Sequence, residues 1–174
     1  YPGHLESRRR LRDGSEVLIR PIRPEDEALM HAWFARLSAE DIRLRFFSAL
    51  KELDRRMAVR MTQIDYDREM SMVAMSTQPG PAELLGIASL NASAEFDEAE
   101  YAITVRTDLK GSGLGRVLML EIIDYAITVG VREIWGEVRR ENAPMLGLLR
   151  KLGFAMHRDP EEPGVMRVSR LLSR

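Results

Sequence analysis

Two periods of hydrophobic and polar positions run along the chain, and they predict where strands and helices lie. In the first third, apolar residues at every second position predict a strand over residues 16–22, and helical spacing predicts a helix that begins near Pro24. Two further short helices are predicted, with Ser38 and Asp54 as their N-terminal caps, and the first of them ends near residues 45–47. The chain is therefore expected to start with one strand and a group of short helices.

The rest of the chain alternates between the same two periods. Strands are predicted over residues 70–76, 83–91, 101–105, 131–138, 154–157 and 165–171, and helices over 117–129 and 142–152. Turn residues 78–81 join the first two of these strands, which predicts an antiparallel hairpin. Strands with intervening helices in the second half indicate an α/β fold, and the hairpin makes its sheet mixed.

Length and local composition favour one compact domain with a short lead-in. The chain has 174 residues, which is the size of a single domain. Residues 1–14 contain turn signals and the basic run 8–10, so we expect a solvated linker ahead of a domain over residues 15–174. Because the chain begins with Tyr1 and not with Met, we expect it to be a piece of a longer protein.

Charge and residue types exclude several classes of function. With 26 basic and 27 acidic residues the net charge is -1, so no nucleic-acid partner is expected. The absence of cysteine excludes disulfides, a thiolate nucleophile and Cys-ligated zinc, and the three histidines are too scattered for a metal site. No apolar run approaches the roughly 18 residues of a membrane-spanning helix, so no membrane partner is expected either.

Three glycines spaced by single residues follow the strand predicted over residues 101–105. They belong to the segment Lys110-Gly111-Ser112-Gly113-Leu114-Gly115-Arg116, which leads directly into a helix. Glycine permits a positive φ and a close approach of ligand to backbone, and the free N–H groups of a helix start favour phosphate. The residue order matches neither the P-loop nor the dinucleotide fingerprint. The segment is therefore a candidate phosphate or pyrophosphate site, with a plain strand-to-helix turn as the alternative.

In its order of motifs the chain resembles the GNAT family of acyl-CoA-dependent N-acyltransferases. The family motif Gln/Arg-x-x-Gly-x-Gly/Ala matches residues 110–115, with Lys110 in the place of Gln or Arg. A later family signature, Asn followed about a dozen residues on by Gly-Phe, matches Asn142, Gly153 and Phe154. The resemblance covers residues 15–172, almost the whole chain.

The chain is similar in particular to the GNAT domain of bacterial protein lysine acetyltransferases that also carry a region like an ADP-forming acyl-CoA synthetase. Residues 19–26 and 43–47 carry this similarity. It implies a cytoplasmic enzyme that transfers acetyl from acetyl-CoA to the ε-amine of a protein lysine, with an acyl-CoA synthetase as one candidate substrate. The alternatives are an acetyltransferase of a small-molecule amine and a non-catalytic domain that senses acyl-CoA. Arg43, Arg45 and Arg68 are candidates to steer an acidic stretch beside a target lysine, although surface composition favours a solvated role.

The resemblance also implies a fold and a cofactor site. The fold is α/β, with a mixed, mostly antiparallel sheet, a splayed parallel strand pair and flanking helices, and acetyl-CoA lies where residues 101–105 and 131–138 splay apart. The residues implied in cofactor binding are Ile103, Val105, Lys110, Gly111, Ser112, Gly113, Leu114, Gly115, Arg116, Asn142 and Met145. Backbone N–H groups of the glycine loop are expected to hold the pyrophosphate, and the first strand's backbone is expected to bind the thioester carbonyl. No metal is implied.

An acceptor amine must lose a proton before it attacks a thioester, and a carboxylate can accept that proton. Glu100 opens the strand that leads into the glycine loop, and it matches the position of the base in several protein-acetylating members of the family. Asp97, Glu98 and Glu95 are close alternatives. Many members that act on small molecules place a proton-donating Tyr seven residues after the Asn, where this chain has Leu149. The chain thus departs from schemes with a dedicated general acid at that position.

Overall fold

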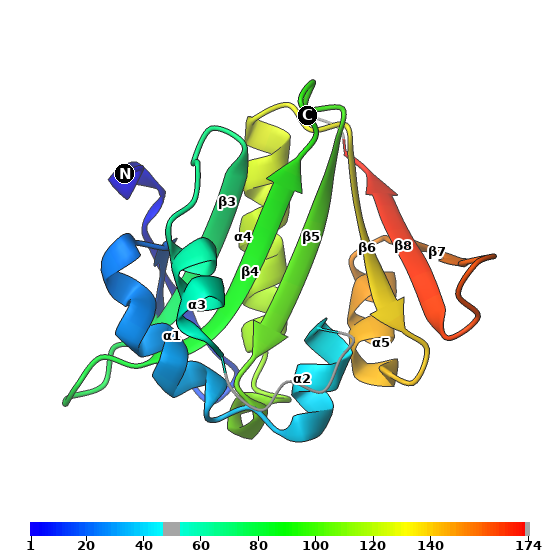
Figure 1. Cartoon of the computed structure of the whole chain (residues 1–174). Helices are drawn as coiled ribbons and strands as arrows, with labels where there is room; N and C mark the ends of the chain where they lie inside the picture. Colours follow the sequence, from blue (N-terminus) through cyan, green and yellow to red (C-terminus); the bar gives the residue numbers. More distant parts are fainter. Residues whose placement is uncertain (47–52, 173–174) are drawn as a thin grey trace.

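The computed structural model describes residues 1–46 and 53–172, and within them eight strands form one sheet in the order β1-β2-β3-β4-β5-β6-β8-β7 (Figure 1). The strands are β1 (Ser7–Arg10), β2 (Glu16–Pro21), β3 (Glu69–Ser76), β4 (Leu84–Ala92), β5 (Glu98–Val105), β6 (Glu133–Arg139), β7 (Ala155–Arg158) and β8 (Val165–Leu171). The helices are α1 (Glu27–Phe34), α2 (Ala39–Phe46), α3 (Arg55–Thr62), α4 (Leu114–Thr128) and α5 (Ala143–Lys151). These bounds confirm the order of elements predicted from the second half of the sequence.

The sheet is mixed and mostly antiparallel, as expected, and its one parallel pair among the described residues is splayed. The strands β5 and β6 pair at only three positions, from Glu98 opposite Glu133 to Glu100 opposite Trp135. Beyond that point they separate like the sides of a wedge, and α2 lies at its open end (Figure 1). The ring of Tyr101 lies against Gly136 where the strands diverge, in a space that any β-carbon at position 136 would occupy.

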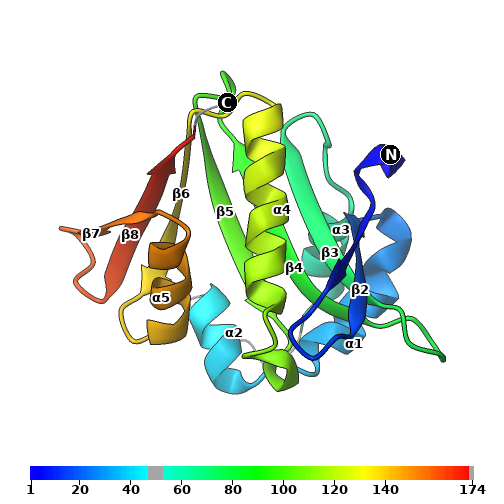
Figure 2. The same ribbon diagram turned by 180° about the vertical axis from the view of Figure 1, so that it is seen from behind.

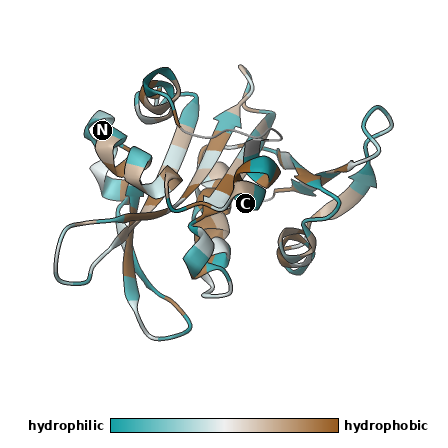
Figure 3. Ribbon diagram, turned by 60° about the horizontal axis from the view of Figure 1, so that its bottom comes forward, coloured by the Kyte–Doolittle hydropathy of each residue, from teal (hydrophilic) through white to brown (hydrophobic). Residues whose placement is uncertain are grey.

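Helices cover the sheet on both faces. The long helix α4 crosses one face, with α5 beside it, while α1 and α3 lie on the other (Figure 2). On the α4 face, Leu118 and Ile122 are fully buried against the central strands, and on the opposite face Met30 and Trp33 of α1 form a second core. Figure 3 shows hydrophobic residues concentrated along these central strands. Among the described residues, no helix combines the length and apolar character needed to cross a membrane.

Local signals in the sequence set the helix ends. The Ser38 hydroxyl accepts a hydrogen bond from the Asp41 N–H at 3.0 Å, and the Asp54 carboxylate accepts one from the Met57 N–H at 2.8 Å. Both caps satisfy an N–H group that a helix start leaves without a partner. Gly153 ends α5 with a φ of 87°, a conformation that glycine adopts without steric cost. The predicted caps and the predicted stop are confirmed.

The structure corrects the prediction for residues 1–14. We expected a solvated linker, but Ser7–Arg10 form the edge strand β1, which pairs antiparallel with β2. The basic run is held by ion pairs, because Arg8 contacts Glu16 at 2.7 Å and Arg9 contacts Glu121 of α4. Exposed and half-buried residues alternate along β1, as they do in an edge strand. Because three successive residues are arginines, the sequence shows no alternation of polar and apolar residues there. The helix expected to end near residues 45–47 is α2, whose last described residue is Phe46, and Phe47 lies outside the described residues.

Candidate functional site

The glycine loop connects β5 to α4 through a short 3₁₀ turn over Thr107–Leu109. Gly111 and Gly113 have φ angles of 82° and 91°, in the left-handed region that other residues rarely adopt. Among the described residues, no backbone carbonyl accepts from the N–H groups of Gly115 and Arg116 in the first turn of α4. A helix start with free N–H groups and a positive dipole end attracts an anion. The loop thus has the geometry of a phosphate cradle.

A cavity of about 530 Å³ opens on this loop and runs along β5 towards α5. Most of the residues predicted to bind cofactor line it, namely Ile103, Val105, Lys110, Gly111, Gly113, Gly115, Arg116, Asn142 and Met145. Two predicted residues do not line it with their side chains: Leu114 is fully buried in the core, and the Ser112 hydroxyl accepts from the Leu114 N–H at 3.3 Å. The roles proposed for these two rest on the backbone alone.

Arg12, which the sequence analysis passed over, also lines this cavity. Its N–H donates to the Ser112 carbonyl at 3.2 Å, and its guanidinium donates to the Gly111 carbonyl at 3.4 Å. The aliphatic part of the side chain covers Gly113, whose missing β-carbon would lie 3.4 Å from the Arg12 Cγ. Arg12 follows the edge strand β1, so pairing of that strand with β2 places it beside a loop about a hundred residues away.

Asp41 of α2 is a second residue that the sequence analysis missed. Its carboxylate is buried, and it accepts from the Lys110 ammonium and, at 2.5 Å, from the Thr107 hydroxyl. Lys110 was expected to add positive charge beside a phosphate, and the structure shows that this charge is shared with Asp41. The contact also holds the N-terminal part of α2 against the entrance of the loop.

The edge of β5 that faces β6 carries unpaired backbone groups. The Arg106 N–H donates to Leu85 of β4 at 2.9 Å, and the pairing of β4 with β5 keeps one register over its whole length. Because hydrogen-bonded positions alternate along an antiparallel ladder, Ile103 and Val105 direct their N–H and C=O groups away from β4 and towards β6. As β6 has already diverged there, these groups face the cavity. The geometry suits a backbone donor for a carbonyl oxygen.

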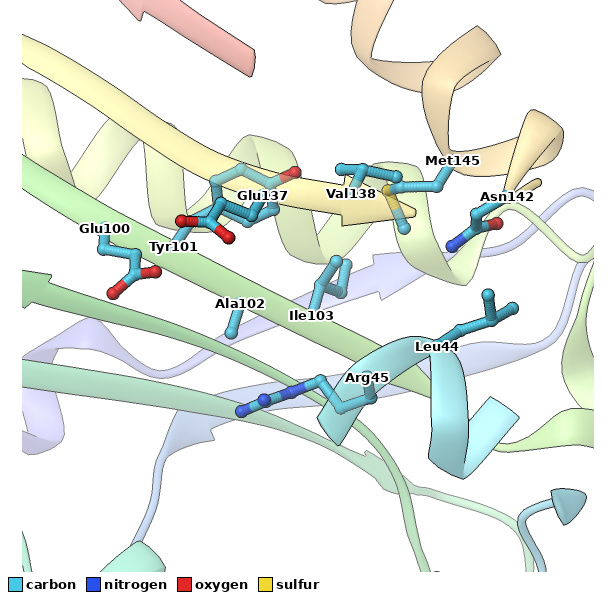
Figure 4. A pocket seen from close by; sticks show the side chains of 10 residues that line it. All are labelled: Leu44, Arg45, Glu100, Tyr101, Ala102, Ile103, Glu137, Val138, Asn142 and Met145. Atoms are coloured by element: carbon cyan, nitrogen blue, oxygen red, sulfur yellow. The ribbon is translucent and has the colours of Figure 1, made fainter. Parts of the chain in front are cut away.

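A second cavity, of about 350 Å³, adjoins the first between the splayed strands. Glu100 of β5 and Glu137 of β6 line it together with Tyr101 and Arg45 (Figure 4). Burial raises the pKa of Glu137, and the nearby charge of Glu100 raises it further. Among the acidic residues considered as the base, Glu100 lines this cavity. Glu137, which was not considered, lines the same cavity.

The sequence analysis missed Glu137, although a signal was present. The strand expected over residues 131–138 was assigned to the splayed pair, and Glu137 is a charged residue within it. Neither Asp97 nor Glu98, both exposed at the start of β5, lines one of the cavities given by the described residues. The acidic patch thus separates into Glu100, which faces a cavity, and residues that face solvent.

Asn142 and Met145 line both cavities from the start of α5. Asn142 occupies the N-cap position of α5, but its side chain makes no capping hydrogen bond. Its amide therefore points to the cavities (Figure 4) and not back to its own helix. Leu149, the position where many relatives carry Tyr, is fully buried in the core.

The described residues contain no group of three or more His, Asp or Glu side chains arranged to hold a metal ion. The cavity at the glycine loop is lined mainly by basic side chains, glycine backbone and apolar residues, and its carboxylate, Asp41, is paired with Lys110. Positive φ glycines, an open helix start and Arg12, Lys110 and Arg116 fit an elongated ligand with a phosphorylated end. Coenzyme A is such a ligand, and the residues present fit it.

The chain is similar to known acetyltransferases over different lengths. It is 35% identical over 152 residues to the acetyltransferase PA5475 of Pseudomonas aeruginosa, covering 87% of this chain and 82% of the relative. It is 44% identical to the ribosomal protein bS18-alanine N-acetyltransferase of Salmonella typhimurium, but over 60 residues, which is 34% of this chain and 40% of the relative. The crystal structure of the GNAT domain of S. lividans PAT superimposes with a TM-score of 0.90 at 28% identity, covering 99% of both chains.

The family model of the acetyltransferase (GNAT) domain matches residues 16–155, from β2 to the start of β7. This range includes the splayed strands, the glycine loop and Asn142. GNAT domains use acetyl-CoA, which agrees with the elongated basic cavity. The chain belongs to the GNAT family of acetyltransferases.

Proposed function

We propose that this GNAT domain transfers the acetyl group of acetyl-CoA to the ε-amine of a protein lysine in the cytoplasm, with Glu100 as the general base. The observation that carries the proposal is the junction of two cavities. The cavity of Glu100 shares Arg45, Ile103 and Asn142 with the cavity of the glycine loop. The proposed proton acceptor and the proposed cofactor site are therefore neighbours along one strand, and this supports direct transfer.

Acetyl-CoA supplies an activated thioester when bound. The chain's own residues hold and orient the two reactants: the glycine loop and Arg12 bind the phosphate end, and the Ile103–Val105 backbone donates to the carbonyl oxygen as negative charge develops there. Glu100 removes a proton from the acceptor amine, directly or through water. Asn142 positions the arm between them.

Similarity supports a protein acceptor. Residues 19–26 and 43–47 resemble protein lysine acetyltransferases, and the superposition on the GNAT domain of S. lividans PAT spans nearly the whole chain. Glu100 is exposed at the mouth of its cavity, so the side chain of a folded protein can reach it. An acyl-CoA synthetase is one candidate substrate. A small-molecule amine is the second candidate, because a further cavity behind Arg45 offers room for a compact acceptor.

The first prediction tests the base. Glu100→Gln should lower kcat for acetyl transfer by about a hundredfold or more, since proton transfer by a positioned side chain contributes about that factor. Its Kd for acetyl-CoA should match the wild type, because Glu100 lies outside the cofactor cavity. Glu98→Gln, two residues earlier on the same strand and exposed, is the matched control and should keep its rate. Equal kcat in Glu100→Gln and wild type across pH would place the base elsewhere.

The acceptor is identified by mass spectrometry. Candidate proteins, acyl-CoA synthetases among them, are incubated with acetyl-CoA and either the wild-type chain or Glu100→Gln. The proposal expects acetylated lysines that depend on the wild-type chain. Acetylation of small amines alone, with no lysine modified, would replace the first candidate by the second.

A further inference from the structure

Glu137 lies on β6, across the wedge between the splayed strands from Glu100 of β5, and both residues line the same cavity. Where the two strands are still paired, Glu100 is opposite Trp135. Because side chains alternate along a strand, Glu137 shares the face of Trp135, which is also the face of Glu100. The two carboxylates therefore enter one space from opposite strands, as Figure 4 shows.

The position of Glu137 along the wedge brings it close to the proposed carbonyl site. The register of the paired residues, continued past the last pair, puts Glu137 across from Ala102. The next residue of β5 is Ile103, whose backbone groups face the cofactor cavity and which lines the cavity of the two carboxylates as well. Along the strand direction Glu137 is thus level with the residue before Ile103, whereas Glu100 is three positions before it. This place suits a group that exchanges a proton with the reacting atoms.

The carboxylates of Glu100 and Glu137 are accessible to a ligand. Both side chains are exposed. Among the described residues, neither carboxylate has a hydrogen bond or an ion pair. Arg167, the neighbour of Glu137 on β8, has its guanidinium over the ring of Trp135, at 4.0 Å from the ring centre. The carboxylate oxygens can therefore accept from an ammonium ion, which has three N–H donors.

The charges close to Glu137 are mostly negative. Burial raises the pKa of Glu137, and the charge of Glu100 raises it further. Asp159 and Glu162 act in the same direction, and Arg167 acts in the opposite one. Further charged or titratable groups on the surrounding elements are Arg45 of α2, Arg139 of β6 and His157 of β7. A cation between Glu100 and Glu137 relieves the repulsion that the two carboxylates exert on each other.

Acetyl transfer to an amine moves two protons, and the proposed base accounts for one of them. A lysine amine has an ordinary pKa of about 10.4, so it arrives as an ammonium ion. Its conversion to an amide forms the N–C bond and breaks the C–S bond and two N–H bonds. One of the two protons ends on the sulfur of coenzyme A, and the other goes to solvent. The position at which many relatives carry a proton-donating Tyr is Leu149 here, fully buried in the core. The second proton thus has no carrier among the residues assigned so far.

We propose that Glu137 is a second catalytic carboxylate: the acceptor binds as an ammonium ion between Glu100 and Glu137, and Glu137 carries its second proton from nitrogen to sulfur. Glu100 takes the first proton and later releases it to solvent. The nitrogen, once bonded to the acetyl carbon, is far more acidic than an ammonium ion, so its proton passes to the Glu137 carboxylate. Glu137 then gives this proton to the departing thiolate and is ionised again, so atoms and charges balance. The inference deepens the proposed function and rests on it, because it takes Glu100 as the base.

Cation binding is tested without turnover, by the carboxyl ¹³C signals of the chain labelled in its glutamate side chains. Glu137→Gln and Glu133→Gln assign two of these signals. The probes are n-butylammonium, which has the carbon chain of a lysine side chain, and 1-butanol, its neutral counterpart. We expect n-butylammonium to lower the pKa of Glu137 saturably by about one unit, as an adjacent opposite charge does. Sodium chloride at the same ionic strength and 1-butanol should not, and the signal of Glu133, on β6 outside the described cavity linings, should stay. If n-butylammonium changes the pKa of Glu137 no more than sodium chloride does, the proposal is overturned.

Turnover tests the proton step, with the acceptor found by mass spectrometry. Glu137→Gln should lower kcat about a hundredfold, the contribution of a positioned proton carrier, while its Kd for acetyl-CoA stays at the wild-type value. Glu137→Asp keeps a carboxylate and should lower kcat only about tenfold. Glu133→Gln is the matched control on the same strand and should keep its rate. Urea unfolding of each variant in the assay buffer separates a lost proton carrier from a lost fold. A wild-type kcat in Glu137→Gln would overturn the proposal.

The outcomes distinguish this proposal from the one on which it rests. A slow Glu100→Gln together with a normal Glu137→Gln overturns the role of Glu137 and leaves the proposed base intact. A slow Glu137→Gln together with a normal Glu100→Gln overturns Glu100 as the base and leaves Glu137 as the catalytic carboxylate. A saturable shift of the pKa of Glu137 by n-butylammonium, with no transfer to any lysine or amine, overturns the proposed function and leaves a cation site.

Discussion

At the scale of single residues, the pair Glu100 and Glu137 sets the electrostatics of the cavity between the splayed strands. Both carboxylates line the same space between the splayed strands, and burial followed by the charge of Glu100 raises the pKa of Glu137. A carboxylate that is partly removed from water beside another negative charge holds its proton more tightly, and here this applies to Glu137. Both side chains are exposed, and of the two it is Glu137 that keeps its proton to a higher pH.

The second prediction concerns pH and stability. Because the folded pKa of Glu137 lies above its unfolded value, the folded state binds more protons between the two values, and the free energy of unfolding falls as pH rises through that interval. Glu137→Gln removes this loss, so it should gain stability relative to the wild type as pH rises from the ordinary glutamate pKa towards neutrality. Urea unfolding at a series of pH values measures the difference. The stability gained by Glu137→Gln should be smaller when Glu100 is also replaced by Gln, because the charge of Glu100 is then absent. If the free energies of unfolding of wild type and Glu137→Gln change with pH in parallel, the prediction is wrong.

At the scale of elements, the glycine loop and the first turn of α4 act as one unit. Gly115 lies inside the helix, where a β-carbon would meet Leu148 and Val105 at ordinary contact distances of 3.7 and 3.8 Å. The protein itself therefore has room for a side chain at this position. Any requirement for glycine there comes from a ligand that approaches the backbone.

The third prediction uses this contrast. Gly115→Ala should stabilise the unliganded chain by about 0.4–1 kcal/mol, as Gly-to-Ala changes do at compatible positions. It should also weaken acetyl-CoA about tenfold, because the new methyl group occupies the cavity. Gly147→Ala in α5 is the matched control: a β-carbon there meets nothing within 4 Å, and Gly147 lies outside the described cavity linings. The control should be stabilised without loss of affinity, as calorimetric titration and urea unfolding will measure. Wild-type affinity in Gly115→Ala would contradict the loop as the phosphate site.

The segment between β1 and β2 contributes to the same unit through Arg12. The fourth prediction is that Arg12→Ala weakens acetyl-CoA about fivefold at low salt, the scale of one exposed charge contact, and less at high salt. Arg10→Ala, which removes an exposed arginine outside the described cavity linings, is the control and should keep its affinity. A salt-independent loss would indicate a packing effect in place of a charge contact.

At the scale of the whole molecule, the sheet consists of two parts joined at one short seam. β1 to β5 and β6 to β8 each pair along most of their length, whereas the seam has three paired positions. The cofactor cavity spans it, since Val105 and Lys110 line it on one side and Asn142 and Met145 on the other. A ligand in that cavity links the two parts.

The fifth prediction is that acetyl-CoA stabilises the fold and protects the seam. At a hundred times its Kd, a ligand that binds only the folded state adds about 2.7 kcal/mol to the free energy of unfolding. Thermal unfolding should shift upwards accordingly, and hydrogen exchange should slow most in β6 and α5. Protection confined to the glycine loop, with β6 and α5 unchanged, would show that the ligand binds one side only.

The strands and helices with regular apolar periods, the caps at Ser38 and Asp54, and the glycine loop were predictable, because each depends on residues close together in sequence. The edge strand β1 was not predicted, since a run of arginines hides the period that pairing with β2 reveals. For the site, the sequence and its family resemblance indicated most of the residues that line the cofactor cavity. They did not indicate Arg12 or Asp41, which reach the loop from distant segments, or Glu137, which faces Glu100 only because the strands splay.

The sequence by itself determined the family, the glycine loop and the candidate base, because motif spacing and periodicity are local properties. The tertiary structure decided which charges share a space: Arg45 lines three cavities, and Glu137 lines one of them together with Glu100. Packing brings together residues that the sequence keeps apart, and it sets how far each charge is removed from water. That is the physical reason why the glycine loop is readable along the chain, while the grouping of Arg45, Glu100 and Glu137 around one cavity is visible only in the folded molecule.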